Sequence, residues 1–342
     1  MSTTTPPTTT RRRFLARAAT AVAVVALATG VAACGSGGSA TGAGDGGAKS
    51  EKLVMGFAQV GAESGWRTAN TKSIQEAAAQ AGVDLKFSDA QQKQENQIKA
   101  IRSYIQQKVD IIAFSPVVET GWDAVLLEAK RANIPVILTD RAIDSPDTSL
   151  YKTFLGSDFV LEGKKAGEWL VQRYQGKTDP VAIVELQGTT GAAPAIDRKE
   201  GFADATKVAP NLQVVASQTG DFTRSGGKQV MEAFLKSQPK IDVVYAHNDD
   251  MALGAIEAIE AAGKVPGKDI TIISVDAVKD GMAALAAGKI NFIVECNPLL
   301  GGQLMDLAKK VKAGESVPQR VLTEETTFDQ AKAAEVLSTR QY

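Results

Sequence analysis

Residues 109–139, VDIIAFSPVVETGWDAVLLEAKRANIPVILT, set the pattern from which the fold of this chain can be predicted. The apolar run at 109–114 is typical of a buried strand, and 122–132 has the apolar spacing of an amphipathic helix. The run at 134–139 is typical of a second strand. A strand, a crossover helix and a following strand usually form a right-handed unit with parallel strands. The stretch therefore predicts an α/β fold in which helices cover both faces of a parallel sheet.

The same alternation extends in both directions along the chain. Before this stretch, strands are expected at 52–58 and 84–87, and helices at 69–81 and 94–107. After it the alternation restarts, and each run has the length of a small α/β domain, so we expect two similar doubly wound lobes. The second run is expected to contain strands at 150–155, 181–186, 212–217, 243–247, 270–275 and 292–295 and helices at 160–174, 193–205, 224–237, 249–262, 281–287 and 299–312.

The first 50 residues have a different composition. Three arginines at 11–13 precede a short apolar run, and small residues end it at Cys34, a pattern typical of an export signal at 1–33 with a twin-arginine-like region and a lipobox. The run is shorter than the roughly 20 residues of a membrane-spanning helix. We expect a lipid on Cys34 to anchor the protein outside the cell membrane, with the Gly/Ser-rich segment 34–50 as a flexible linker.

The composition argues against several functional classes. The net charge is −1, so no nucleic-acid-binding surface is expected. His247 is the only histidine in the sequence and a Gly-x-Ser-x-Gly motif is missing from it, so we predict no enzyme, no metal site and no cofactor. The glycine spacing from Gly56 to Gly65 does not match a dinucleotide loop, and no helix is expected to begin within that segment. His247 and Cys296 are expected at buried strand ends.

Ligands of doubly wound sheets bind beyond the carboxyl ends of the strands, so the polar residues that follow each strand are candidates. Asp140 and Arg141 follow one strand, and a carboxylate beside a planar guanidinium matches the adjacent hydroxyls of a sugar. A strand-end salt bridge is the alternative. The amide of Asn248 also suits hydroxyl groups, and one of the two aspartates after it is expected to cap the next helix. The spacing of these acids does not match a calcium loop.

Two aromatic residues, Trp66 and Phe222, are expected in loops that follow strands. The C–H faces of a sugar ring pack against aromatic rings. The alternative is that these side chains fill the core, since aromatic residues dominate cores by buried area.

Several segments of the sequence together resemble the type I periplasmic sugar-binding proteins of ATP-binding-cassette importers, above all the galactofuranose-binding members. The resemblance covers the chain from about residue 51 to its end. The segments are GFAQVGAESGWR (56–67), QQKQENQIKA (91–100), SPVVETGW (115–122), VELQGTTG (184–191) with AIDR (195–198), GDFTR (220–224) and YAHNDDM (245–251).

The resemblance implies a monosaccharide ligand, galactofuranose above others, and permease subunits of an importer as partners. It also implies that the protein is a monomer and that it does not bind nucleic acid. One of Glu295, Cys296 and Asn297 is expected near the ligand, and the resemblance leaves open which. The implied ligand-binding residues are Glu63, Ser64, Trp66, Arg67, Asp140, Arg141, Arg198, Phe222, Asn248 and Asp276.

The family fold further implies a hinge of three chain crossings, near residues 157, 297 and 326. Lobe 1 is then 51–156 plus 297–325, and lobe 2 is 157–296 plus 326–342. Binding would close the lobes around the ligand. A receptor for another sugar, a pentose, a quorum signal or a chemotactic ligand stays open, while an exported glycosidase is less favoured. A repressor of this fold would carry a DNA-binding motif in place of the export signal.

Overall fold

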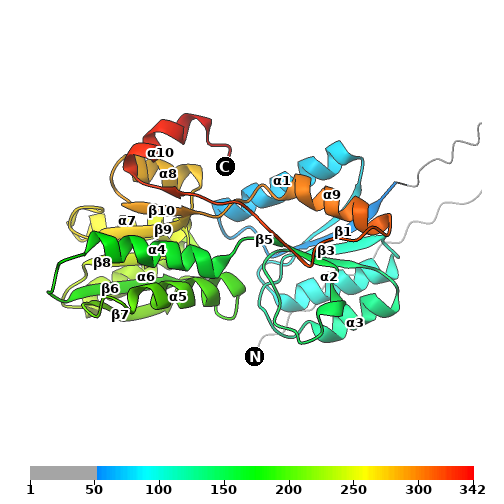
Figure 1. Cartoon of the computed structure of the whole chain (residues 1–342), viewed down its shortest axis with the longest axis horizontal. Coiled ribbons are helices and arrows are strands. Elements are labelled where there is room, and N and C mark those ends of the chain that lie inside the picture. Colours follow the sequence, from blue (N-terminus) through cyan, green and yellow to red (C-terminus); the bar gives the residue numbers. More distant parts are fainter. Residues whose placement is uncertain (1–51) are drawn as a thin grey trace, which may run out of the picture. The chain divides into compact units, whose positions relative to one another are not determined.

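The computed structural model describes residues 52–342, which fold into two parallel-sheet α/β lobes (Figure 1). The predicted fold class is thereby confirmed. The predicted export signal, the lipidation at Cys34 and the linker lie outside the described residues. Within the part that is described, no helix combines the length and the apolar character needed to cross a membrane.

The first lobe contains a six-stranded sheet with the order β11-β5-β4-β3-β1-β2, in which all strands are parallel. Apolar side chains alternate between its faces: Ile112 and Phe114 of β3 pack toward α2 and α3, whereas Ile111 packs toward α1 and α9. The elements are β1 (Val54–Gln59), α1 (Gly65–Ala81), β2 (Asp84–Asp89), α2 (Gln94–Gln106), β3 (Ile111–Phe114), α3 (Asp123–Arg131), β4 (Val136–Asp140), β5 (Thr153–Gly156), α9 (Gly301–Lys312) and β11 (Arg320–Leu322).

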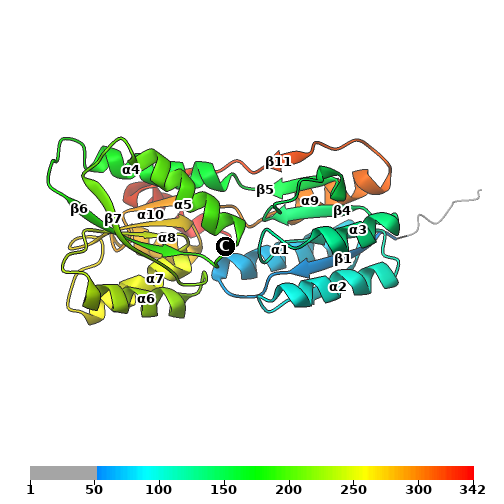
Figure 2. The ribbon, with the colours of Figure 1, turned by 90° about the horizontal axis from the view of Figure 1, so that it is seen from below.

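The second lobe repeats this plan with the order β12-β10-β9-β8-β6-β7, and only its short edge strand β12 runs antiparallel. One hydrophobic core lies between this sheet and helices α4 and α5. A second lies between the sheet and helices α6, α7, α8 and α10 (Figure 2). The elements are α4 (Phe159–Arg173), β6 (Val181–Gln187), α5 (Ala193–Thr206), β7 (Leu212–Thr219), α6 (Arg224–Ser237), β8 (Val243–Ala246), α7 (Asp249–Ala261), β9 (Thr271–Asp276), α8 (Lys279–Ala286), β10 (Phe292–Glu295), β12 (Thr327–Phe328) and α10 (Gln330–Val336).

Helix α1 begins earlier than its apolar spacing predicted. Ser64 is its N-cap: the backbone there is extended, and the side-chain oxygen accepts a hydrogen bond from the N–H of Arg67. The expectation that no helix begins before Ala69, and that Trp66 lies in a loop, is therefore wrong. Both Trp66 and Arg67 project from the first turn of a helix, which holds their side chains more firmly than a loop would.

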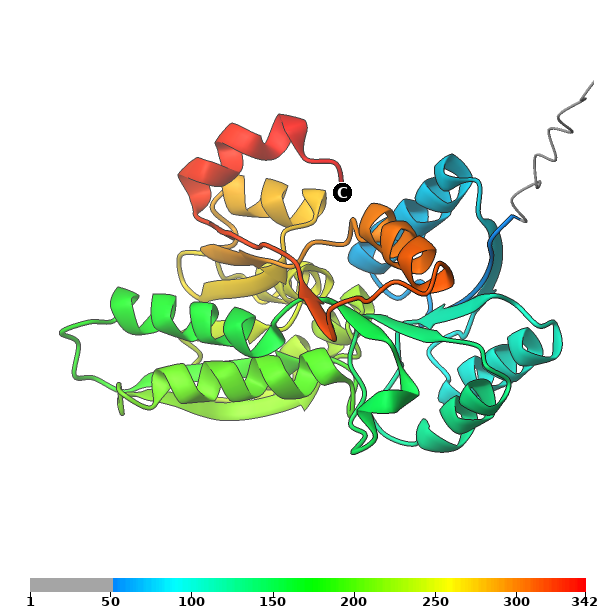
Figure 3. The same cartoon turned by 45° about the vertical axis from the view of Figure 1, so that its right-hand side comes forward.

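Three connections join the two sheets, and Figure 3 shows them running side by side. They are the segments between β5 and α4, between β10 and α9, and between β11 and β12. The short strands β11 and β12 and the helix α10 were not predicted. With three, two and seven residues, they are too short to show a period in the sequence.

Candidate functional site

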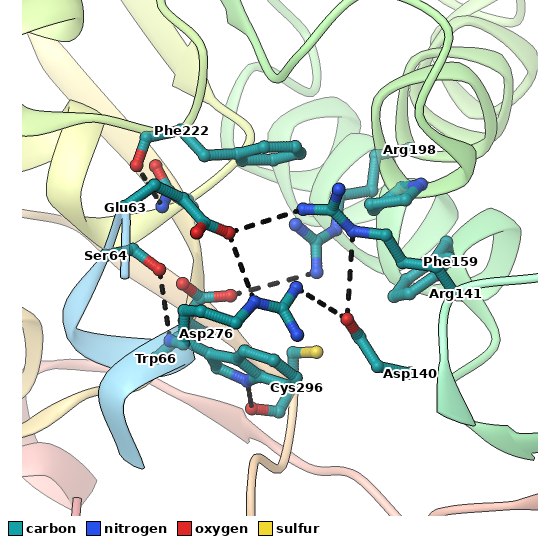
Figure 4. Close-up of a pocket in the computed structure, with 13 residues that line it drawn as sticks. Glu63, Ser64, Trp66, Asp140, Arg141, Phe159, Arg198, Phe222, Asp276 and Cys296 are labelled. Atoms are coloured by element: carbon teal, nitrogen blue, oxygen red, sulfur yellow. Dashed lines mark hydrogen bonds and ion pairs between the residues drawn. The ribbon is translucent and has the colours of Figure 1, made fainter. Parts of the chain in front are cut away.

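The strand ends and helix starts of both sheets surround one cavity (Figure 4). All ten residues predicted to bind the ligand line it, which places them together without establishing their roles. Three further residues line the cavity, Phe159, Pro194 and Cys296. The candidate site is thus made of both lobes.

Four buried charged side chains of the first lobe form a compact network. Arg67 is its centre: Nη2 lies 2.6 Å from Asp140 Oδ2, and Nε lies 3.1 Å from Glu63 Oε1. Arg141 approaches the same two carboxylates, with Nη2 3.6 Å from Glu63 Oε1 and Nε 3.7 Å from Asp140 Oδ2. Two positive and two negative groups therefore balance one another, which buried charges require.

This network leaves two hydrogen-bonding atoms unused. Oε2 of Glu63 and Nε of Arg141 are buried and have no hydrogen-bond partner. A buried polar group without a partner costs about 1–3 kcal/mol. A ligand with hydroxyl groups that reaches this network can satisfy both atoms, because a hydroxyl donates and accepts hydrogen bonds.

The second lobe contributes Arg198, whose guanidinium is held from several sides. Its Nε donates to Glu162 Oε2 at 2.7 Å, and Nη1 donates to the carbonyl oxygen of His247 at 2.6 Å. Its Nη2 lies 3.8 Å from Oδ1 of Asp276, the last residue of β9. The fixed guanidinium thus presents its remaining donors next to a carboxylate at the cavity wall.

Asn248 both lines the cavity and caps a helix. Its Oδ1 accepts from the N–H of Met251 at 3.0 Å, and its Nδ2 donates to the carbonyl oxygen of Phe222 at 3.1 Å. The prediction that Asp249 or Asp250 caps α7 is therefore wrong, because Asn248 is the N-cap. One amide hydrogen of Asn248 remains for a ligand.

Aromatic rings lie against the arginines of the site. Arg141 lies over the ring of Phe222 at 5.3 Å from guanidinium carbon to ring centroid, and Arg198 over Phe159 at 5.1 Å. Arg67 lies over Trp66 at 4.7 Å, a cation–π arrangement like the other two.

Phe159 was not predicted, because in the sequence it is an ordinary apolar residue at the start of a helix. Pro194 in the first turn of α5 likewise gives no signal in the sequence.

Of the three residues left open at the second crossing, Cys296 lines the cavity. Its carbonyl oxygen accepts a hydrogen bond from Trp66 Nε1 at 2.7 Å. Glu295 instead binds Arg340 and Tyr342, and the side chain of Asn297 accepts from the N–H of Leu299. As expected, Cys296 is buried.

Burial and neighbouring charges shift the protonation of the site. Burial lowers the pKa of Arg141 to about 10, helped by the nearby cation Arg67. Burial opposes ionisation of Glu63, yet Arg67 and Arg141 outweigh it and lower its pKa. Burial raises the pKa of Asp276 well above the ordinary value in spite of Arg198. The two lobes therefore offer different carboxyls, one held as an anion and one that resists ionisation.

The strand-end histidine is buried and paired. His247 Nε2 lies 3.1 Å from Glu185 Oε1, and burial lowers the pKa of the imidazole. The ring is not among the cavity residues. His247 therefore serves the site through its backbone carbonyl, which binds Arg198.

The two lobes also contact each other at the rim of the cavity. The N–H of Gly65 donates to Asp250 Oδ2 at 2.8 Å, and the N–H of Glu119 donates to the carbonyl oxygen of Gly191 at 2.9 Å. Asp250 lies in the first turn of α7, and Gly65 is the first residue of α1. These contacts cross from one lobe to the other, so they can exist only when the lobes are close.

Comparison with known proteins places the chain in a family. Residues 55–316 match the model of the periplasmic binding protein domain. The galactofuranose-binding protein of Escherichia coli is 50% identical over 298 residues, which are 86% of this chain and 93% of that protein.

Solved structures are similar as well. A Mycobacterium smegmatis protein in complex with β-D-fucofuranose is 70% identical, has a TM-score of 0.84, and aligns over 85% of this chain and 95% of its own. The binding protein of the arabinose transporter from Shewanella sp. ANA-3, bound to L-arabinofuranose, is 50% identical with a TM-score of 0.81 and aligns over 84% and 96%. With the two-lobed fold, the cavity between the strand ends and the match over most of its length, the chain belongs to the periplasmic binding protein family.

Proposed function

We propose that this protein is an extracytoplasmic receptor that captures a monosaccharide, galactofuranose, and delivers it to an ATP-binding-cassette importer. It is a binding protein rather than an enzyme, acts as a monomer, and is held at the membrane by a lipid on Cys34. The names of its relatives support this proposal: they include binding proteins for galactofuranose, fructose and ribose.

One observation carries the proposal. Glu63 and Arg141 line the cavity, and each holds a buried atom without a hydrogen-bond partner, the acceptor Oε2 and the donor Nε; the guanidinium of Arg141 lies over the ring of Phe222. A sugar presents neighbouring hydroxyls that donate and accept, and C–H faces that pack on aromatic rings. A wholly apolar ligand would leave both atoms unsatisfied.

The furanose form is favoured by the similar solved structures, which hold β-D-fucofuranose and L-arabinofuranose. Galactofuranose shares its ring with fucofuranose and differs by a hydroxyl, so the same charged network can hold either.

Isothermal titration calorimetry with the purified protein tests the proposal. We expect D-galactose, D-fucose and L-arabinose to bind through their furanose forms, and each to raise the melting temperature, because the ligand binds only the folded protein. Methyl β-D-galactofuranoside and methyl β-D-galactopyranoside separate the ring forms. Binding of the pyranoside alone would contradict the furanose proposal. Failure of every sugar to bind would point to another small polar ligand, such as a signal molecule.

A further inference from the structure

Glu162 lies behind the sugar-facing arginine of the second lobe. It is in the first turn of α4, is fully buried, and does not line the cavity. Its Oε2 accepts the hydrogen bond from Nε of Arg198 at 2.7 Å. Since His247 holds Nη1 from another side, Glu162 helps to determine where Nη2 of Arg198 lies. The residue therefore acts on the cavity through Arg198.

The second oxygen of Glu162 is the unusual feature. Oε1 is buried without a hydrogen-bond partner. The hinge residues Cys296 and Glu325 lie close to this carboxyl group: the Sγ atom and one carboxylate oxygen of each acid are all within 4.8 Å of one another. Burial keeps Cys296 a neutral thiol, because it raises the pKa of the thiol well above its usual value. An anionic Glu162 would thus lie close to a second carboxylate, with only a weakly donating thiol beside them.

Glu325 joins the three hinge connections. Its Oε1 accepts hydrogen bonds from Ser157 Oγ in the first connection, from the N–H of Asn297 in the second at 3.3 Å, and from Thr323 Oγ1 in the third at 2.9 Å. Three donors therefore converge on one oxygen of Glu325. Glu162 has one donor, Nε of Arg198 on Oε2, and none on Oε1, so of the two neighbouring carboxyl groups Glu162 has the oxygen that is free to carry a proton.

We propose that Glu162 is a positioning residue that carries a proton on Oε1, holds Arg198 through Oε2, and donates the proton toward Glu325 at the hinge. This inference rests on the proposed function, because it takes Arg198 as a sugar-binding residue. The proton turns the unpartnered oxygen into a donor. It also leaves the positive charge of Arg198 available to Asp276 and the ligand.

The charges around Glu162 agree with a neutral carboxyl. Burial raises its pKa well above the ordinary value; Arg198 lowers it, and Glu325 raises it again. The other titratable groups that face it are Asp276 after β9, Tyr245 on β8 and the thiol of Cys296. Burial also raises the pKa values of these three groups. Arg198 is the cation in this set, and its charge favours the ionised form of Glu162.

Two substitutions at position 162 test the proposal by calorimetry with D-fucose and L-arabinose. Glu162→Gln keeps an oxygen for Arg198 and an N–H for Glu325, so it imitates the protonated acid. We expect Glu162→Ala to weaken binding by about tenfold or more, and Glu162→Gln by no more than about threefold. Glu168→Gln, at an exposed position of the same helix where Glu168 pairs with Lys164, is the matched control. Melting curves check that each variant is folded.

The pH dependence of sugar affinity shows whether the proton on Glu162 matters for binding or whether the side chain only supports the structure. Wild-type affinity should fall toward alkaline pH as Glu162 loses its proton, and Glu162→Gln should remove that part of the profile while leaving the parts due to Arg141 and Asp276. Equal loss of affinity in the Gln and Ala variants, with the alkaline profile unchanged, would overturn the proposal.

An infrared difference spectrum of wild type minus Glu162→Gln, without sugar, tests the proton independently of function. We expect a carbonyl band of a protonated carboxylic acid near neutral pH. Carboxylate bands in its place would overturn the inference even if sugars bind. If no sugar binds the wild type, the proposed function fails, and the infrared band still decides whether Glu162 carries a proton.

Discussion

Arg141 combines a charge, a buried position and an unused donor. It lies between the carboxylates of Glu63 and Asp140 and over the ring of Phe222. Arg141→Ala should weaken sugar binding by about 10- to 100-fold, because it removes hydrogen bonds to the ligand and leaves Glu63 with less compensation. Calorimetry measures this loss. Arg102→Ala, which removes an exposed arginine paired with Glu128, should bind sugar like the wild type.

Arg141→Lys refines that prediction. An ammonium is a point charge and cannot present the planar fork of a guanidinium, so affinity should be only partly restored relative to Ala. Wild-type affinity in the Ala variant would remove Arg141 from the binding site.

Asp276 illustrates a cost in stability at a residue that lines the cavity. Its pKa is raised well above 3.8, chiefly by burial, so the folded protein holds this proton more tightly than the unfolded chain does. The free energy of unfolding therefore decreases as pH rises from about 3.8 through the folded pKa. Asp276→Asn should raise the free energy of unfolding of the sugar-free protein at pH 7 by about 1 kcal/mol or more, and less at pH 4.

Urea unfolding at the two pH values measures this difference, and calorimetry should show that the same variant binds sugar more weakly. If Asp276→Asn is less stable than the wild type at pH 7, burial of the Asp276 carboxyl is not what costs stability. Arg198 keeps its hydrogen bonds to Glu162 and to the carbonyl oxygen of His247 in the variant.

At the scale of elements, the start of α1 meets the start of α7 across the rim of the cavity. The carboxylate of Asp250 accepts from the N–H of Gly65, at the positive end of the α1 dipole. Asp250 does not line the cavity. Asp250→Asn should therefore speed sugar dissociation about 2- to 5-fold by weakening closure, and leave the association rate nearly unchanged.

Stopped-flow measurement of tryptophan fluorescence gives both rates. Asp280→Asn is the control, because Asp280 is exposed on the same lobe and also lies near Arg224. An unchanged dissociation rate in Asp250→Asn would show that this contact does not help to hold the lobes together.

At the scale of the whole molecule, the proposed lipid anchor can be tested without the structure, since Cys34 lies outside the described residues. Cys34→Ser should move the protein from the membrane fraction to the soluble fraction, because the protein would then carry no lipid. Fractionation followed by immunoblotting measures the change, with sugar affinity as the control for folding. Retention in the membrane fraction would contradict lipidation at Cys34.

Sequence reasoning predicted the alternating strands and helices and the two lobes, because buried strands and amphipathic helices leave local periods. It also indicated Asp140, Arg141 and Asn248, because polar residues directly after buried strands lie at one edge of a parallel sheet. Its errors are local too: hydrogen bonds of the side chains decided that Ser64 starts α1 and Asn248 caps α7.

Only the tertiary structure decided how distant residues meet. The strand order and the three connections bring Glu63 and Arg198, 135 positions apart in the numbering, to one cavity. They also place Phe159 and Cys296 on its wall and Glu162 beside Glu325. No local spacing encodes these neighbours, since they depend on contacts between elements far apart in the chain. The sequence by itself determined most of the elements and the family, whereas the packing of two sheets determined the site.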